Sequence, residues 1–167
     1  MSDHKKAAPK QITLGVITCS STRTLSEDKG GNWICRRAVR EGCEVVRHVV
    51  VPDDALIIAA AVRQTVEELS PHALILTGGT GVTEKDVTIE AVRPLFQKEL
   101  SAFGTLFAYL SFEEIDSAAL LSRATAGIVG KTAVFCIPGS LNACKMACKN
   151  LIFPELGHLA AHIHGKA

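Results

Sequence analysis

Residues 73–88, ALILTGGTGVTEKDVT, join a run of apolar residues to a glycine-rich turn and then to a threonine that can begin a helix. The apolar run has no polar alternation, which is the pattern of a strand buried on both faces in a parallel sheet. Such a sheet needs helices on both faces, because each face is hydrophobic. The turn follows the carboxyl end of the strand, where open α/β sheets bind their ligands. This segment therefore predicts an α/β fold and a candidate ligand-binding loop.

Strand and helix patterns alternate along the rest of the chain. The expected strands cover residues 11–18, 43–51, 72–77 and 132–137, and the expected helices cover residues 32–42, 55–69, 88–96 and 101–112. A short helical piece near 117–123, a hairpin turn at Gly130 and Lys131, and terminal helices complete the pattern. Gly30 and Gly31 mark a loop, and Pro94 should break or kink its helix.

This order of elements predicts a three-layer α/β/α domain with a mostly parallel, mixed central sheet, because right-handed crossovers place helices on both faces. Residues 11–167 are expected to form this single domain. Residues 1–10 carry charge without an apolar segment behind it, which predicts a flexible N-terminal tail rather than a signal peptide.

The composition excludes several classes of protein. The 18 basic and 17 acidic residues give a net charge of +1, which argues against nucleic acid as a main partner. The longest apolar run, residues 55–62, is much shorter than the roughly 20 residues that cross a bilayer, so no membrane span is expected. None of the six cysteines has CxxC spacing, which is typical of buried thiols in a cytoplasmic protein.

Two aspartates and a glycine loop are candidates for chemistry. The glycines at 78, 79 and 81 leave backbone N–H groups that can hold a phosphate, or they only form a tight turn. Asp53 and Asp86 follow predicted strands, and two carboxylates beside a phosphate favour a magnesium site. The alternative is helix capping, which Asp53 or the adjacent Asp54 could provide for the helix at 55–69.

A third loop, Pro138-Gly139-Ser140, comes directly before a predicted helix. It can bind a second anion, or Ser140 only caps the helix.

Other patterns are weaker. Gly130-Lys131-Thr132 imitates the end of a phosphate-binding P-loop, but Thr125 occupies the first glycine position and a strand follows. The pairs Cys144/Cys148 and His158/His162 lack further ligands at zinc spacing, so metal binding is not expected there.

The combination of TGGTG with Asp86-Val87-Thr88, LSFEEI at 110–115 and IPGSLNAC at 137–144 resembles the MoaB/MogA family of molybdenum cofactor biosynthesis proteins. This family includes the G domains of gephyrin-like proteins, and the resemblance is closer to its MoaB branch. It extends from about residue 12 to about residue 155.

The resemblance implies a molybdopterin-binding domain that acts as a nucleotidyltransferase. Magnesium-ATP would adenylylate molybdopterin before metal insertion, and the protein would be a homotrimer that can pair into a homohexamer. The catalytic and Mg²⁺-binding residues would be Asp53 and Asp86. The substrate-binding residues would be Gly78, Gly79, Thr80, Gly81, Ser20, Pro138, Gly139 and Ser140.

Three positions depart from the family pattern. Ser21 stands where MogA-like members have Asp, Gly30 where relatives often have Ser, and Thr105 where an acidic residue is common. These departures leave open a non-catalytic molybdopterin-binding or carrier protein of the same fold, or a trimeric scaffold with a vestigial site.

Overall fold

The computed structural model describes residues 11–165, so the predicted tail at 1–10 and residues 166–167 lie outside the described part of the chain. Six strands form one sheet in the order β2-β1-β3-β6-β5-β4. Their bounds are β1 Ile12–Cys19, β2 Cys43–Val51, β3 Ala73–Thr77, β4 Lys98–Glu99, β5 Thr125–Val129 and β6 Thr132–Ile137. The strands β2, β1, β3 and β6 are parallel, and β5 is antiparallel to both β6 and β4. The predicted mixed, mostly parallel sheet is therefore confirmed.

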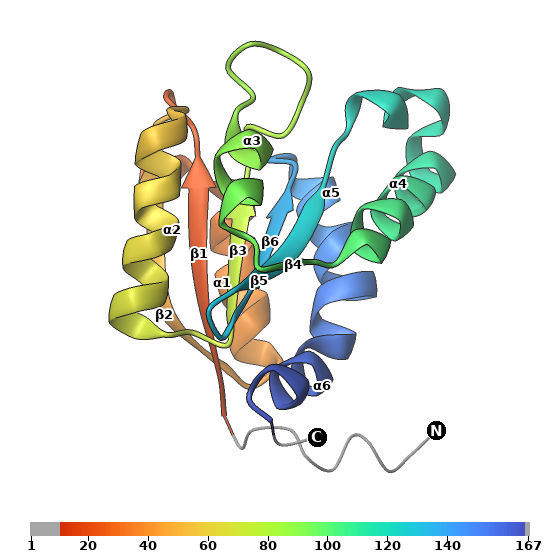
Figure 1. The fold of residues 1–167 in the computed structure, drawn as a ribbon. Helices are drawn as coiled ribbons and strands as arrows, with labels where there is room; N and C mark the ends of the chain where they lie inside the picture. The colour runs from red at the N-terminus through yellow and green to blue at the C-terminus, as the bar shows by residue number, and fades with distance from the viewer. Residues whose placement is uncertain (1–10, 166–167) are drawn as a thin grey trace.

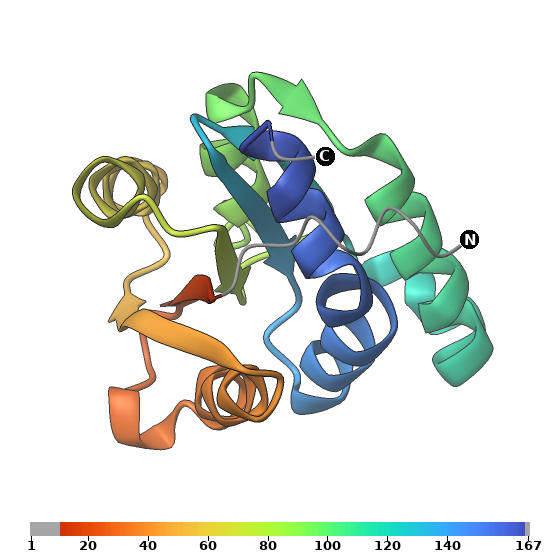
Figure 2. The ribbon, with the colours of Figure 1, turned by 90° about the horizontal axis from the view of Figure 1, so that it is seen from below.

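Helices cover both faces of this sheet (Figures 1 and 2). They are α1 Lys29–Arg40, α2 Ala55–Leu69, α3 Thr88–Val92, α4 Ser101–Ile115, α5 Leu141–Ala147 and α6 Phe153–Ile163. Short 3-10 segments cover Leu25–Glu27, Arg93–Leu95 and Asp116–Leu121, and a π-helical turn, Cys148–Ile152, joins α5 to α6. One core cluster packs α1, α4, α5 and α6 against the sheet, and a second packs α2 and α3 against the other face.

The strand β3 shows why its sequence is apolar throughout. Ala73 and Ile75 belong to one core cluster, whereas Leu74 and Leu76 belong to the other. All four side chains are fully buried. Successive side chains of a strand point to opposite faces, so a strand covered on both sides needs an apolar residue at every position.

Local signals predicted most elements, although several differ from the structure, and α4 extends three residues beyond its predicted end. The prediction that Gly30 and Gly31 form a loop is wrong: both lie in the first turn of α1, which begins at Lys29 because Asp28 caps it by accepting a hydrogen bond from the Gly31 N–H. The two-residue edge strand β4 was not predicted. The interruption at Pro94 is confirmed, since α3 gives way there to a 3-10 segment.

Candidate active site

Three loops meet at the carboxyl ends of β1, β3 and β6, around Gly78. The Gly78 N–H donates to the carbonyl of Ile137 at 3.0 Å, and a Cβ placed on Gly139 would lie 3.0 Å from the Gly78 Cα. Gly78 has a φ of +94°, and a Cβ there would collide with the carbonyl oxygen of Cys19. Only glycine therefore lets the three loops approach so closely.

The N–H groups of this glycine loop, residues 77–81, are less available than the sequence predicts. The Gly78 N–H is used by Ile137, and the Gly81 backbone donates to the carboxylate of Asp86. Within residues 11–165 the N–H groups of Gly79 and Thr80 have no hydrogen-bond partner. The expectation of three free glycine amides is therefore corrected to the two consecutive amides in the middle of the loop.

Asp53 lies against the glycine loop and does not cap a helix. Its Oδ2 accepts from the Ser21 N–H at 2.8 Å, and its own N–H donates to Ser21 Oγ at 3.0 Å. Its Oδ1 lies 3.4 Å from where a Cβ on Gly79 would be. The adjacent Asp54 caps α2 by accepting from two amides of the first turn. The capping alternative thus applies to Asp54, and Asp53 faces the loop.

Asp86 lies against the same loop at Gly81, where an added Cβ would be 2.8 Å from Oδ2. This oxygen also accepts from Thr83, from its N–H at 2.9 Å and its hydroxyl at 2.7 Å. The Thr83 hydroxyl has the largest effect on the carboxyl and lowers its pKa, so Asp86 is ionised near neutral pH. The N-cap of α3 is Val87, which excludes helix capping by Asp86.

The two carboxylates therefore flank one short loop, from Gly79 to Gly81. Within residues 11–165 no group of three or more His, Cys, Asp or Glu side chains could hold a metal ion. Magnesium, however, is commonly bound by one or two carboxylates together with phosphate oxygens of a substrate. Asp53 and Asp86 fit that donor set.

Arg123 holds the glycine loop in shape, a role that was not predicted from the sequence. Its Nε donates to the carbonyls of Thr80 and Gly81 at 3.0 and 2.9 Å, and its Nη1 pairs with Glu90 at 2.6 Å. The Thr80 hydroxyl is buried and has no partner among the described residues. Arg123 lies more than 40 residues from the loop, so no local spacing could have indicated this contact.

The remaining predicted site residues shape the neighbouring loops. Ser20 Oγ accepts from the N–H groups of Thr22 and Arg23 at 3.4 and 3.2 Å, and so holds the loop after β1. The carbonyl of Pro138 accepts from a Thr77 hydroxyl at 3.1 Å. Ser140 caps α5 by accepting from the third amide beyond it. The capping alternative for Ser140 is confirmed.

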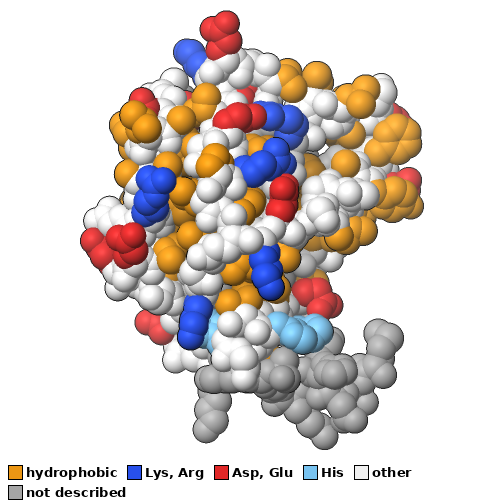
Figure 3. Space-filling model, in the orientation of Figure 1, with side chains coloured by type: hydrophobic (Ala, Val, Ile, Leu, Met, Phe, Trp, Pro, Cys, Tyr) orange, Lys and Arg blue, Asp and Glu red, His pale blue; other side chains and the backbone are white. Residues whose placement is uncertain are grey.

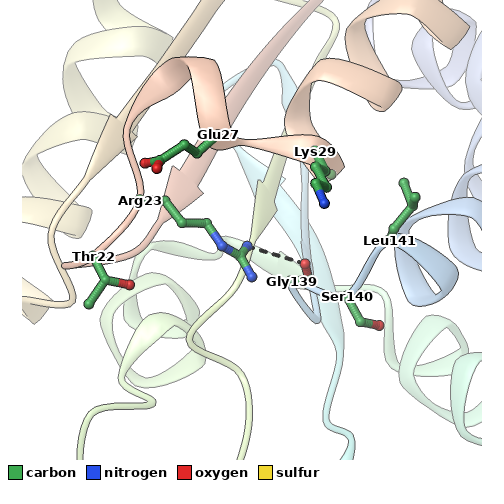
Figure 4. A pocket seen from close by; sticks show the side chains of 8 residues that line it. Thr22, Arg23, Glu27, Lys29, Gly139, Ser140 and Leu141 are labelled. Carbon is green, nitrogen blue, oxygen red and sulfur yellow. Dashed lines mark hydrogen bonds between the residues drawn. The ribbon is translucent and has the colours of Figure 1, made fainter.

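A pocket of about 390 Å³ opens beside Gly139 (Figure 4). Its lining comes from the loop after β1, the start of α1 and the turn before α5. These residues are Thr22, Arg23, Glu27, Lys29, Gly30, Gly139, Ser140 and Leu141. A Cβ on Gly30 would lie 3.1 Å from the Cys144 sulfur, so this floor of the pocket is tight, and a serine there would require Cys144 to shift.

Beneath this pocket, Asp28 is fully buried. Its carboxylate accepts from the Thr18 hydroxyl at 2.6 Å, from the Gly31 N–H at 2.9 Å and from His48 Nε2 at 2.9 Å. These contacts tie the start of α1 to β1 and β2. No local sequence pattern had marked Asp28 as a structural residue.

The cysteine and histidine pairs each have a local environment that the structure describes. Burial raises the pKa of both Cys144 and Cys148, and the Cys144 sulfur lies 3.2 Å from the Thr77 hydroxyl. The Nε2 atoms of His158 and His162 lie 2.7 Å apart, so one ring donates to the other. Neither pair has a third ligand within residues 11–165.

Comparisons with known proteins match nearly the whole chain. A family model described as a probable molybdopterin binding domain matches residues 15–158. Molybdenum cofactor biosynthesis protein B of Bacillus cereus is 41% identical over 165 residues, covering 98% of each chain. A crystal structure of a molybdenum cofactor biosynthesis protein B has a TM-score of 0.91 and 40% identity, covering 95% of this chain and 99% of the other.

A fourth match, the crystal structure of the tungsten cofactor synthesizing protein MoaB from Pyrococcus furiosus, has a TM-score of 0.84 and 39% identity. It covers 93% of this chain and 99% of the other. The predicted α/β fold and the resemblance stated from the sequence are both confirmed by these matches.

Proposed function

The chain belongs to the family of probable molybdopterin-binding domains, and from this premise we propose that it adenylylates molybdopterin with magnesium-ATP. Its relatives named molybdenum cofactor biosynthesis protein B support a role in molybdenum cofactor biosynthesis. The observation that carries the proposal for catalysis is the position of two carboxylates, Asp53 and Asp86, against one glycine loop.

In the proposed reaction a terminal phosphate oxygen of molybdopterin forms a bond to the α-phosphorus of ATP. The bond between the α-phosphorus and the bridging oxygen breaks, and pyrophosphate leaves with its electron pair. The amides of Gly79 and Thr80 donate to the pterin phosphate, and Arg123 keeps the loop in the shape that aims them. Holding two substrates in line in this way supplies much of the rate enhancement.

Asp53 and Asp86 would hold magnesium together with triphosphate oxygens. Magnesium, when bound, neutralises charge on the phosphates as pyrophosphate leaves. The Ser21 and Thr83 hydrogen bonds fix the orientation of both carboxylates before substrate arrives. Because both carboxylates are already oriented, less free energy is needed to organise the site during the reaction.

The test is incubation of the purified protein with molybdopterin, ATP and magnesium. Adenylyl-molybdopterin and pyrophosphate should form in equal amounts. Asp53→Asn and Asp86→Asn should abolish turnover while molybdopterin binding persists, and Asp54→Asn, at the neighbouring carboxylate that caps α2, should keep turnover. Absence of product from folded wild-type protein would rule out the catalytic proposal, and equal loss of binding and turnover would make both aspartates binding residues.

A second candidate is a protein that binds molybdopterin without turning it over. The observation in its favour is that both carboxylates already accept hydrogen bonds from the protein, Asp53 from Ser21 in the loop after β1 and Asp86 from Thr83 in its own loop. Molybdopterin binding by calorimetry, with no ATP-dependent product, would select this candidate.

We also propose that the protein is a homotrimer that can pair into a hexamer. Large apolar side chains are exposed along α4 and just after it (Figure 3). They are Leu106, Tyr109, Phe112, Ile115, Leu120 and Leu121, with exposed fractions of 47–84%. Contiguous apolar surface of this kind is typical of an interface between copies. Light scattering on the purified protein tests the assembly.

No helix within residues 11–165 is both long and apolar enough to cross a membrane. The cytoplasm remains the proposed compartment, and fractionation of cells that express the protein would test it.

A further inference from the structure

The pocket beside Gly139 carries two basic side chains to which the proposed chemistry gives no role. Arg23 comes from the loop after β1, and Lys29 is the first residue of α1. Figure 4 shows the guanidinium and the ammonium group pointing into the same space in front of Gly139. The cavity of about 390 Å³ is within the usual range of small-molecule sites, about 300–1,000 Å³.

Arg23 is held in place. Its Nη1 donates to the carbonyl of Gly139 at 3.3 Å, across 116 residues of sequence. The N–H of the same residue donates to Ser20 Oγ. A guanidinium with one nitrogen fixed in this way presents its remaining donors in a defined plane, which suits the oxygens of a phosphate.

The acidic residue of the pocket is engaged elsewhere. The Glu27 carboxylate accepts from both the N–H and the hydroxyl of Thr24, at 3.0 and 2.8 Å. In Figure 4 its oxygens point away from Lys29. The positive charge of Arg23 and Lys29 is therefore not cancelled by an ion pair with Glu27.

One loop connects this basic pocket to the acidic pair of the candidate site. Ser21 hydrogen-bonds Asp53, and Arg23, two residues further on, lines the pocket. Two residues of extended chain span at most about 7 Å. The loop therefore places the Cα atoms of Ser21 and Arg23 close together, between the acidic pair and the basic pocket.

We propose that Arg23 and Lys29 form a subsite for the pyrophosphate portion of a nucleoside triphosphate, separate from the glycine loop. This assignment rests on the proposed function for its role in turnover. The binding of pyrophosphate itself does not depend on that function.

The experiment is calorimetric titration of the full chain with inorganic pyrophosphate and, separately, with inorganic phosphate. Wild-type protein should bind pyrophosphate more tightly than phosphate. Arg23→Gln and Lys29→Gln should each weaken pyrophosphate binding about tenfold or more, because a charge-assisted contact is lost. Both side chains are exposed, so the variants should fold, which circular dichroism verifies.

Lys131→Gln is the matched control. Lys131 is exposed in the turn that precedes β6, whereas the pocket lies beyond the other end of that strand. It should bind pyrophosphate like wild type. Glu27→Gln should bind pyrophosphate more tightly, because it removes a negative charge from the rim.

Three results would overturn the subsite: no pyrophosphate binding by the wild type, equal weakening by Lys131→Gln, or phosphate binding as tight as pyrophosphate binding. The last would assign the pocket to a phosphate monoester such as that of the pterin. Failure of the proposed function gives a different result, with pyrophosphate binding intact and no adenylylated product.

Discussion

Replacing Asp28 by alanine should be among the most destabilising single changes in this chain. The side chain is fully buried and accepts three hydrogen bonds, from Thr18, Gly31 and His48. Its loss removes the cap of α1 and the contact that joins this helix to β1 and β2. The change tests whether the interactions beneath the basic pocket carry stability.

The magnitude follows from these three contacts. Losing a helix N-cap costs about 1 kcal/mol. Each buried donor left without an acceptor costs about 1–3 kcal/mol, and here the donors are the Thr18 hydroxyl and His48 Nε2. Because the His48 side chain is 16% exposed and can reach water, we expect a total cost in the lower half of the range that these three contributions add up to. Asp28→Ala should therefore reduce the free energy of unfolding by about 3–5 kcal/mol.

Asp54→Ala is the matched control, since Asp54 also caps a helix with its side chain but is exposed and accepts only from two amides of α2. It should cost about 1 kcal/mol. Urea denaturation followed by circular dichroism, at one fixed protein concentration, measures both variants. If both variants lose the same 1 kcal/mol with unchanged m-values, the buried contacts of Asp28 contribute nothing and the reasoning is wrong.

The same carboxylate predicts a pH dependence. Burial alone would raise the pKa of Asp28, but the hydrogen bonds from Thr18, His48 and Gly31 outweigh it and hold the pKa below its ordinary value. Because the pKa of this carboxyl is lower in the folded than in the unfolded protein, its ionised form stabilises the fold fully above about pH 4. This contribution is lost as the pH falls through the folded-state pKa. The stability difference between wild type and Asp28→Asn should therefore narrow only below about pH 4. A difference that narrowed between pH 8 and pH 5 would contradict this assignment.

Three further predictions test the loop and the thiols. Arg123→Lys keeps the charge but loses the paired donation to two loop carbonyls, so the adenylylation rate should fall about 10- to 100-fold. The matched control Arg93→Lys should leave this rate unchanged, and steady-state kinetics measures both variants. Gly78→Ala should reduce the free energy of unfolding by about 3 kcal/mol or more, and Gly42→Ala by about 1–2 kcal/mol. Both glycines have a positive φ, but only at Gly78 would an added Cβ meet a backbone carbonyl, so equal losses of unfolding free energy in urea denaturation would refute this reasoning. Partial burial raises the pKa of Cys35 to about 11, so iodoacetamide followed by mass spectrometry should find it alkylated on the order of 100-fold more slowly than an unhindered thiol. A rate near that of a free thiol would contradict this raised pKa.

Local patterns were sufficient for most of the fold. The bounds of α2 and β2 agree with the sequence prediction at every residue, because helical or β-branched periodicity and flanking turn residues define them within one segment. The apolar run of β3 predicted a sheet covered on both faces. The glycine loop and the two aspartates could be placed at the carboxyl edge because parallel connection fixes which strand ends share that edge.

Local sequence patterns could not predict the contacts between segments that are distant in the sequence. The sequence could not decide whether Asp53 or Asp54 caps α2, because both stand at the right spacing; the Ser21 loop, 32 residues away, decided it. It could not show that Ile137 takes the Gly78 amide, or that Arg123 holds the loop. Composition, period and turn chemistry determined which elements form and which loops share an edge. The packing of those loops decided which polar groups are left to meet a substrate, since a hydrogen bond across 40 or more residues leaves no local trace in the chain.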